Sequence, residues 1–327
     1  MSTRRPRSAS APPRTASILG LGAFVPAGVL TSGEIAQRLG VTEEWIVKRT
    51  GIRARRRAEP SQRTSDLATI AARRALQDAA VQAGDLDLVL VATMSQDEAT
   101  PNTAPLVAHA LAAERAGAFD VGAACTGWLA ALAQAAAQVE SGRAEHVLVV
   151  GVDTLTRMTD FDDRMVAGLF GDGAAAVVVG PDGAGAIGPI ELAADGSLGG
   201  VITASLEDRM IRMDGTSTFK IAVSRLSDWI ARVAAAAGWD VADVDVFVPH
   251  QANGRIIRAV GERLGLEPAK VADYVGEVGN TSAASIPIAL SQLRADGRLR
   301  GGHKVIVAAV GAGFTWGAGA LTWTSDS

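Results

Sequence analysis

Apolar residues follow two different patterns along the chain. At residues 88–92 and 146–152 apolar side chains succeed one another almost without a break, as in a parallel strand that is covered on both faces. At residues 65–83 the apolar side chains Leu67, Ile70 and Leu76 fall on one stripe of a helix. Strands and helices that alternate in this way predict an α/β protein, with helices on the faces of mostly parallel sheets.

The order of these elements repeats in the two halves of the chain. In the first half we expect strands at 17–25, 88–92, 118–121, 146–152 and 174–179, and helices at 34–39, 42–47, 65–83, 104–113 and 129–139. In the second half we expect strands at 187–192, 244–248, 274–275, 303–310 and 314–323, and helices at 219–237, 252–264 and 284–295. This correspondence predicts two pseudo-symmetric βαβαβαββ halves, 17–185 and 186–327, in a layered αβαβα sandwich.

Composition narrows the range of functions. A formal net charge of -4 over 327 residues argues against a general nucleic-acid binder. No apolar run is long enough to predict a membrane span. Residues 1–16 hold Arg4, Arg5, Arg7 and Arg14 among small residues and prolines, which predicts a disordered basic tail, with a basic interaction arm as the alternative. A single cysteine cannot form an internal disulfide, which fits the reducing cytoplasm.

That cysteine, Cys125, stands between the expected strand at 118–121 and the expected helix at 129–139. The start of a helix offers unpaired N–H groups and a positive dipole end, which favour a thiolate and predict a lowered pKa. Such a thiol is a candidate nucleophile. The alternative is a small buried apolar residue, because free cysteine is among the most buried residue types.

Three further residues follow the ends of expected strands, and ligands of open α/β sheets bind at such ends. They are His250 after 244–248, Asn280 after 274–275 and Gly313 after 303–310. Each has a plain structural alternative: a hydrogen-bonded histidine, an ordinary Gly-Asn turn and a tight glycine turn. Because all three would lie near Cys125, the set predicts a catalytic site.

Four motifs of the chain resemble those of β-ketoacyl-acyl carrier protein synthase III. They are Gly122-Ala123-Ala124-Cys125, Val248-Pro249-His250-Gln251-Ala252-Asn253, Gly279 to Ser285 and Gly311-Ala312-Gly313-Phe314. The resemblance extends over nearly the whole chain after about residue 17, and it implies the thiolase-like fold. It also implies a homodimer without metal or redox cofactor. Each motif is weak by itself, but their combination and order are specific.

The resemblance implies a decarboxylating condensation of acyl-CoA with malonyl-acyl carrier protein, which starts fatty-acid or polyketide synthesis. Cys125 would carry the acyl group, since an acyl-cysteine is itself a thioester. His250 and Asn280 would donate to the enolate oxygen that forms when CO2 leaves, and the N–H groups of Cys125 and Gly313 would hold the oxyanion. The alternative within this fold is an acyltransferase that moves the group from Cys125 to an alcohol or amine without condensation.

The resemblance also implies substrate contacts. Trp45 and Arg164 would enclose the adenine of coenzyme A by stacking, and Arg49 would lie near its phosphates. For Trp45 the alternative is a half-buried core residue. The pantetheine channel would be lined by Met213, Phe219 and Asn253.

Acyl carrier protein is acidic, so a basic rim is expected at the mouth of the channel. The expected contacts are Lys220, Gln251, Arg255, Arg258 and Arg263. Their alternative is a set of ordinary solvated helix faces. Glu262 stands where some relatives have a basic contact, which leaves the partner preference open.

Two further positions depart from the family pattern. Trp128 follows the nucleophile where a smaller aromatic is usual, and it is expected either to reshape the pocket or to pack the helix. Thr100 stands where some relatives carry a Phe that closes the acyl pocket across a dimer interface. A small residue there predicts room for longer or branched acyl groups.

Overall fold

The protein is described by a computed structural model that covers residues 14–181 and 183–323. Most of the expected basic tail, residues 1–13, lies outside the described residues. Arg14, within that expected tail, forms an ion pair with Glu145 at 2.9 Å, and the first strand begins two residues later, at Ala16.

The first half of the chain supplies one large sheet, its helices and a small hairpin. In chain order its elements are β1 (Ala16–Phe24), β2 (Gly28–Thr31), α1 (Ser32–Leu39), α2 (Glu43–Thr50), β3 (Ala54–Arg57), α3 (Thr64–Asp78), β4 (Leu88–Ala92), α4 (Thr103–Leu111), β5 (Gly117–Val121), α5 (Gly127–Glu140), β6 (Val147–Thr154) and β7 (Asp172–Pro181).

The second half supplies the other large sheet. Its elements are β8 (Ala186–Ala194), β9 (Ile202–Ala204), β10 (Ile211–Met213), α6 (Gly215–Ala236), β11 (Val246–Pro249), α7 (Gly254–Arg263), α8 (Val275–Val278), α9 (Ser285–Ala295), β12 (Lys304–Gly311) and β13 (Thr315–Thr322).

The two large sheets share one topology. The strand order is β1-β7-β6-β4-β5 in the first sheet and, read in the same sense, β8-β13-β12-β11 in the second. In both sheets the first two pairings are antiparallel and the next is parallel. The sheets are therefore mixed, where the sequence predicted mostly parallel ones, because the last strand of each half runs antiparallel to the strand before it.

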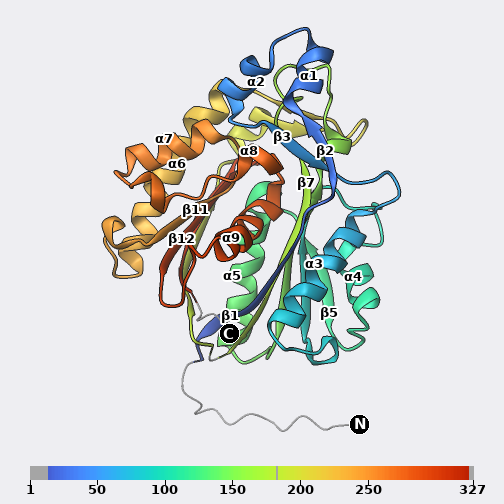
Figure 1. Ribbon diagram of the computed structural model, residues 1–327. Helices are drawn as coiled ribbons and strands as arrows, with labels where there is room; N and C mark the ends of the chain where they lie inside the picture. The colour runs from blue at the N-terminus through green and yellow to red at the C-terminus, as the bar shows by residue number, and fades with distance from the viewer. Residues whose placement is uncertain (1–13, 182, 324–327) are drawn as a thin grey trace.

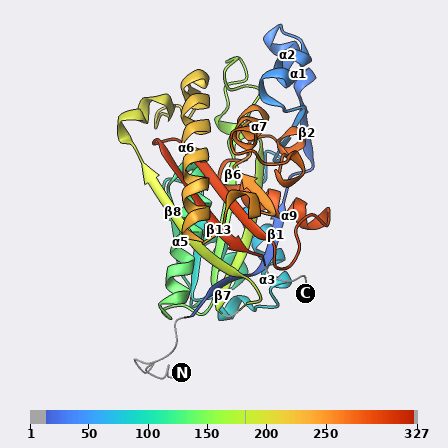
Figure 2. The ribbon, with the colours of Figure 1, turned by 90° about the vertical axis from the view of Figure 1, so that its left-hand side faces the viewer.

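Helices α5 and α9 lie between the two sheets, as Figure 1 shows. Helices α3 and α4 cover the outer face of the first sheet, and α6 and α7 lie on the outer side of the second (Figures 1 and 2). The chain thus has the predicted αβαβα order of layers: helices lie between the two sheets and on the outer face of each.

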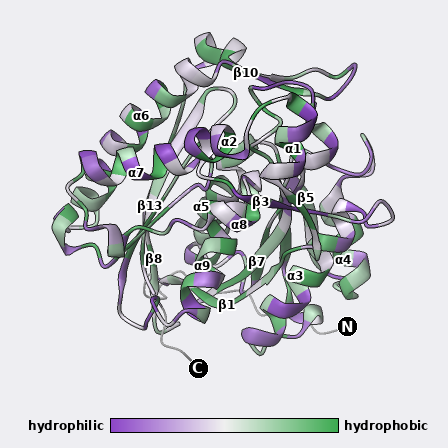
Figure 3. Ribbon diagram, turned by 45° about the horizontal axis from the view of Figure 1, so that its top comes forward, coloured by the Kyte–Doolittle hydropathy of each residue, from purple (hydrophilic) through white to green (hydrophobic). Residues whose placement is uncertain are grey.

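The middle layer is where the main hydrophobic core lies. Fully buried side chains from both halves meet there, among them Leu129 and Leu132 of α5 and Leu290 and Leu293 of α9. Apolar residues, green in Figure 3, accordingly gather on the strands and inner helices. Burying each such leucine contributes roughly 1.5–3 kcal/mol, so the shared core joins the halves into one folding unit. The proposed division after residue 185 falls between β7 and β8.

Some expected elements differ in the structure. Helix α1 is fixed by local signals, a Thr31–Glu34 capping box at its start and left-handed Gly40 after its end, and was predicted. The hairpin β2–β3 and the short pair β9–β10 were not predicted. The prediction of a strand at 274–275 is wrong, because Tyr274 precedes α8 and Val275 begins it. In place of a fifth strand, the second sheet has one isolated parallel bridge between Phe247 and Val271.

Strand β6 and the start of α9 approach each other so closely that a glycine is required. A Cβ atom on Gly151 would lie 2.3 Å from the carbonyl oxygen of Ala283, which is closer than any real contact. We therefore expect Gly151→Ala to lower the free energy of unfolding by about 1–3 kcal/mol or more, because backbone must move. Denaturant unfolding measures this.

Gly84→Ala is the matched control, since a Cβ there would meet nothing within 4 Å. It should leave the stability within about 0.5 kcal/mol. Equal effects of the two substitutions would contradict the close approach.

Candidate active site

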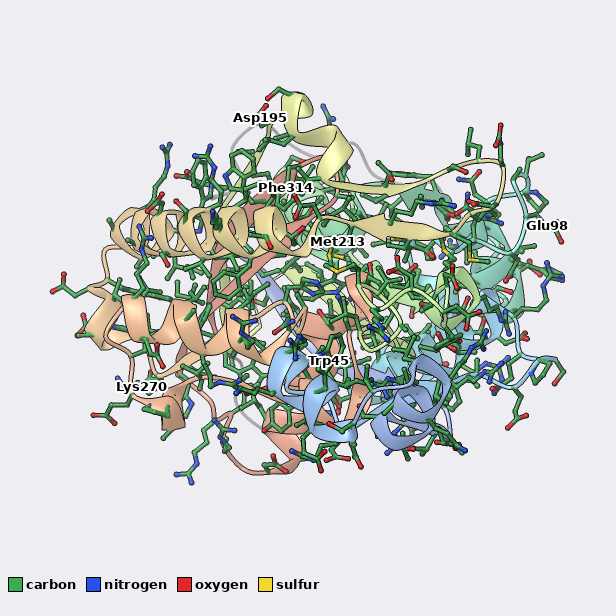
Figure 4. All side chains as sticks on the ribbon, turned by 90° about the horizontal axis from the view of Figure 1, so that it is seen from above. Trp45, Glu98, Asp195, Met213, Lys270 and Phe314 are labelled. Carbon is green, nitrogen blue, oxygen red and sulfur yellow. The ribbon has the colours of Figure 1, made fainter. Side chains whose placement is uncertain are left out.

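A cavity of about 570 Å³ opens at one end of the layered body. Cys125, His250 and Asn280 all line it, so the structure brings together the three side chains that the sequence singled out. Seen from above, Trp45 and Met213, which also line the cavity, lie over the middle of the molecule (Figure 4).

Cys125 lies in a short 3-10 turn, Ala124–Thr126, that leads directly into α5. Ala124 has a φ of 45, a left-handed conformation that is uncommon for a residue with a side chain. Gly311, at the end of β12, packs on this turn so closely that a Cβ there would lie 2.9 Å from the Cys125 nitrogen. The second sheet thus fixes the backbone of a nucleophile that the first half of the chain carries.

The thiol of Cys125 is less acidic than the sequence predicted. Burial raises its pKa to about 12, whereas the helix start was expected to lower it. A buried site removes the water that would solvate a thiolate, and this outweighs the dipole of one helix. Cys125 therefore rests as a neutral thiol at neutral pH.

His250 follows β11 and is almost fully buried. Its Nδ1 lies 2.6 Å from the hydroxyl oxygen of Ser285, and the backbone N–H of Gln251 donates to that same oxygen at 3.2 Å. The Ser285 proton is thus free to be donated to Nδ1, which leaves Nε2 carrying the ring proton as a donor. Burial lowers the pKa of His250 to about 3, so the imidazole is neutral.

Asn280 is held through its backbone. Its N–H donates to the carbonyl oxygen of Leu169, and its carbonyl accepts from the N–H of Gly171, both at 2.9 Å. The side-chain oxygen accepts a hydrogen bond from the N–H of Ser282 at 2.9 Å. Because that oxygen is engaged, the NH2 group is the part of the amide left to donate to a ligand.

Gly313 is not among the residues that line the cavity, although its neighbours Ala312 and Phe314 are. The expected use of its N–H group stays a prediction.

All six of the expected coenzyme contacts line the cavity: Trp45, Arg49, Arg164, Met213, Phe219 and Asn253. The Arg49 guanidinium lies over the Trp45 ring at 4.0 Å from its centroid. The Asn253 amide caps α7 and donates to the carbonyl oxygen of Arg49 at 3.2 Å, which ties α7 to α2. These residues surround the mouth from α2, β10, α6, the start of α7 and the segment before β7.

Two of the expected substrate contacts lie elsewhere. Trp128 is only 1% exposed, belongs to the core between the sheets and does not line the cavity, so it packs the helix and does not shape the pocket. The reason is its position one residue into α5, on the side of the helix that faces the core. Thr100 is exposed on the loop before α4 and does not line the cavity of its own chain.

The expected carrier-protein contacts differ among themselves. Lys220 and Arg255 line the cavity, and Arg255 lies over the Phe219 ring. Arg258 and Arg263 lie on α7 and are near carboxylates, at 3.5 Å from Asp273 and 3.6 Å from Asp228 respectively, which reduces the positive charge they offer.

Gln251 is not available as a surface contact. It is 3% exposed, and its amide donates to the carbonyls of Pro249 and Ala272 and accepts from the N–H of Tyr274. These bonds fix the loop that follows β11, so the expectation of a carrier contact here was wrong. The loop after β11 directs the Gln251 side chain inward, away from the protein surface.

Sequence reasoning missed several residues of the site. Met94, Leu155 and Phe170 line the cavity from connecting segments, and no periodic pattern marks such residues. Ser285 lies within a motif that the sequence singled out, but its bond to His250 depends on how α9 packs on β11 within the second half.

Comparisons with known proteins agree with this geometry. Residues 119–196 match the family described as 3-Oxoacyl-[acyl-carrier-protein (ACP)] synthase III, and residues 234–323 match its C-terminal family. A relative from Streptomyces coelicolor, Beta-ketoacyl-[acyl-carrier-protein] synthase III 3, is 42% identical over 95% of this chain and 98% of its own length.

Solved structures give the same answer. The 3-oxoacyl-[acyl-carrier-protein] synthase III of Aquifex aeolicus has a TM-score of 0.92 and 39% identity, covering 94% of this chain and all of that one (100%). The priming β-ketosynthase of the R1128 polyketide pathway has a TM-score of 0.92 and 38% identity, covering 98% of this chain and 100% of that one.

The fold and the residues around the cavity define an acyltransferase with the thiolase-like α/β fold, as the sequence predicted. Within that class, the chain belongs to the β-ketoacyl-acyl carrier protein synthase III family. In the part of the chain that the structure describes, no helix has both the length and the apolar character needed to cross a bilayer.

The raised pKa of Cys125 has a direct test in the resting enzyme. We expect the logarithm of the iodoacetamide alkylation rate to rise by one per pH unit from about pH 6 to about pH 9, whereas an ordinary thiol levels off near pH 8.5. Intact mass spectrometry follows the reaction, with glutathione as the reference thiol. A plateau at or below about pH 8 would support the lowered pKa instead.

Proposed function

We propose that this chain condenses an acyl-CoA with malonyl-acyl carrier protein and releases coenzyme A and CO2, forming a 3-ketoacyl-acyl carrier protein. The observation that supports this most is the meeting of Cys125, His250 and Asn280 around one cavity. The relatives' names describe the same reaction class. The reaction starts fatty-acid or polyketide synthesis, and its thiol nucleophile and CoA substrate fit a location in the reducing cytoplasm.

In the first step the sulfur of Cys125 attacks the thioester carbon of acyl-CoA. A carbon–sulfur bond forms to the enzyme, the bond to coenzyme A breaks, and the thiol proton leaves with the coenzyme A sulfur. The tetrahedral intermediate between attack and loss of coenzyme A carries an oxyanion. We propose that the backbone N–H groups of Cys125 and Gly313 stabilise it.

In the second step the malonyl group loses CO2, and its electron pair passes to the thioester oxygen as an enolate. Neutral His250, with its proton on Nε2, and the free NH2 of Asn280 are the two donors for that oxygen. The enolate carbon then attacks the carbonyl carbon of acyl-Cys125, the carbon–sulfur bond to the enzyme breaks, and the departing thiolate takes one proton from water to restore the thiol.

The mouth of the cavity is suited to a long, negatively charged thioester. Trp45 and Arg164 offer an indole and a guanidinium for the adenine ring, and Arg49 offers a charge for the phosphates. Among the expected carrier-protein contacts, Lys220 and Arg255 line the cavity, so we propose them as the principal contacts for the acidic carrier protein.

The rival function is transfer of the acyl group from Cys125 to an alcohol or amine. It requires no enolate, and so gives no reason for a buried amide with an unengaged NH2 group. Release of CO2 from malonyl-acyl carrier protein separates the two reactions.

We expect Asn280→Ala to lower the rate of CO2 release and condensation by about 10²–10³-fold, because one oxyanion donor is lost. Acylation of Cys125 should be retained, since that step does not use the enolate site. Radiometric CO2 release and intact mass of the acyl-enzyme measure the two steps separately.

Asn102→Ala is the control, because Asn102 is exposed and its side chain makes no capping bond to α4. Equal loss of both steps in Asn280→Ala, or acyl transfer by the unaltered enzyme without CO2, would contradict the condensation.

We further propose that the chain forms a homodimer through β5. This strand is the end strand of the first sheet, and Phe119 on it is 45% exposed. An unpaired strand edge with an apolar residue can pair with the same strand of a second copy around a two-fold axis. Asp120 of β5 accepts from the N–H groups of Thr103 and Ala104, so the loop with Thr100 lies at the same edge.

We expect Phe119→Asp to convert the dimer to a monomer, because two carboxylates would face each other across the paired edges. Light scattering coupled to gel filtration measures the mass. Leu206→Asp is the control, since Leu206 is fully exposed (100%) and remote from β5 in sequence, between β9 and β10. A monomeric unaltered protein, or a dimeric Phe119→Asp protein at equal concentration, would contradict the interface.

A further inference from the structure

Two threonine hydroxyls join the turn that carries Cys125 to the turn that carries Gly313. The hydroxyl oxygens of Thr126 and Thr315 lie 2.9 Å apart, which is a hydrogen-bond distance. Thr126 is almost fully buried and ends the 3-10 turn before α5, whereas Thr315 is partly buried and begins β13. The contact therefore crosses from the first half of the chain to the second, directly beside the nucleophile.

Each hydroxyl also lies close to a backbone carbonyl. Thr126 is 2.7 Å from the oxygen of Ala123, and Thr315 is 3.1 Å from the oxygen of Ala312. Three short distances thus link four oxygens, but the two hydroxyls supply only two protons. The Ala123 oxygen also accepts from the N–H of Thr126 at 3.1 Å, so it keeps a donor when the hydroxyl of Thr126 donates to Thr315. Both carbonyls have a donor when the hydrogen bonds run from Thr126 to Thr315 to Ala312.

The bond to Ala312 orients the N–H group of Gly313. The peptide that joins Ala312 to Gly313 is trans and planar, so its C=O and N–H groups point in opposite directions. The side chain of Thr315 also lies against Gly313, because a Cβ there would be 2.8 Å from the Thr315 Cγ2 atom. A carbonyl held toward Thr315 therefore directs the Gly313 N–H to the opposite side of this peptide.

The other end of the contact lies in the turn that carries Cys125. The N–H of Thr126 donates to the carbonyl of Ala123 and closes this turn around Cys125. Gly311 packs on the same turn, since a Cβ there would lie 2.9 Å from the Cys125 nitrogen and 3.3 Å from the Thr126 nitrogen. One contact between two turns sets their distance, and a second contact also sets their relative orientation. The hydroxyl bond is this second contact.

A bonded pair of threonine hydroxyls can also serve stability alone. Thr64 and Thr154 form such a pair at 2.9 Å, and the hydroxyl of Thr64 donates to the carbonyl oxygen of Ser95 at 2.7 Å. Neither of these threonines lines the cavity. Thr126 and Thr315 differ from them in place, because one follows Cys125 and the other is bonded to the peptide of Gly313.

We propose that Thr126 and Thr315 are positioning residues that hold the N–H groups of Cys125 and Gly313 in the geometry of one oxyanion site. The two hydroxyls act through the backbone. Donors that are already aligned stabilise an oxyanion without reorganising when it forms. Because an oxyanion forms there only if Cys125 accepts an acyl group, this role rests on the proposed function.

The test compares two reactions of the same sulfur, acylation by a short acyl-CoA and alkylation by iodoacetamide. Acetyl-CoA and isobutyryl-CoA are the acyl probes, and single-turnover intact mass spectrometry follows both reactions. Acylation of Cys125 passes through an oxyanion, whereas alkylation displaces iodide in one step and forms none. The ratio of the two rate constants therefore reports the oxyanion site and not the state of the thiol.

In Thr315→Val we expect the saturating rate constant of acylation to fall about tenfold, less than the 10²–10³-fold that loss of an oxyanion donor costs. Valine keeps the shape of threonine but cannot donate to Ala312. The half-saturating acyl-CoA concentration and the alkylation rate should not change, because neither depends on the oxyanion. A purely structural role would alter both reactions together.

The order of the hydrogen bonds predicts an order among further variants. Thr126→Val leaves Thr315 bonded to Ala312, so acylation should fall only about threefold. The double variant should lose about tenfold, as Thr315→Val does, whereas independent effects would multiply to about thirtyfold. Thr126→Ser keeps the hydroxyl and should acylate at the rate of the unaltered enzyme.

Thr64→Val is the matched control, because it removes a hydroxyl from the other threonine pair, and it should leave the ratio unchanged. An unchanged ratio in Thr315→Val, multiplied losses in the double variant or an equal loss in Thr64→Val would overturn the proposal. If Thr315→Val does not fold, equal acylation rates in Thr126→Val and Thr126→Ser would overturn it instead. Condensation is measured separately by CO2 release, so its failure is distinguishable from a failure of this positioning role.

Discussion

The close approach of each sheet to the helix that starts in the other half organises this molecule. Gly311 of the second sheet lies against the turn that carries Cys125, and Gly151 of the first sheet lies against Ala283. Backbone meets backbone at both places, so there is no room for a side chain. This constraint sets where α5 and α9 begin, and with them where Cys125 and Asn280 stand, so the catalytic geometry depends on the packing of the halves.

The same arrangement explains the electrostatics of the site. Burying the helix starts between two sheets removes water from the thiol and the imidazole, which keeps both neutral. A neutral imidazole held by Ser285 serves better as a fixed donor than as a base. On the proposed mechanism, the site stabilises charge that appears during the reaction, and it holds little charge on these two groups beforehand.

Much of this could be predicted from the sequence, because Cys125 and His250 each follow the end of an expected strand, and strand ends converge in such folds. Asn280 was also expected to follow a strand, but residues 275–278 form α8, so the structure does not bear out that reason for its place. The errors have physical causes. Gln251 adjoins His250 in sequence, yet its amide is bonded inward to Ala272. Of the two roles expected for Trp128, the structure agrees with packing of the helix, because a helical pattern does not say which face meets a cavity. Met94 and Leu155 reach the cavity from connecting segments whose path only the packed structure defines.

The stack of Arg49 on Trp45 has a consequence for how the mouth fills. On the proposed role of Trp45, an adenine ring that stacks on the face covered by Arg49 would displace the guanidinium from the indole. Binding therefore exchanges one stacked group for another. The net binding free energy is the difference between the two stacking energies plus the energy of any new contact that the released guanidinium makes. An arginine displaced beside a polyphosphate finds that partner at once, so an adenine that arrives with its phosphates is favoured over the base alone.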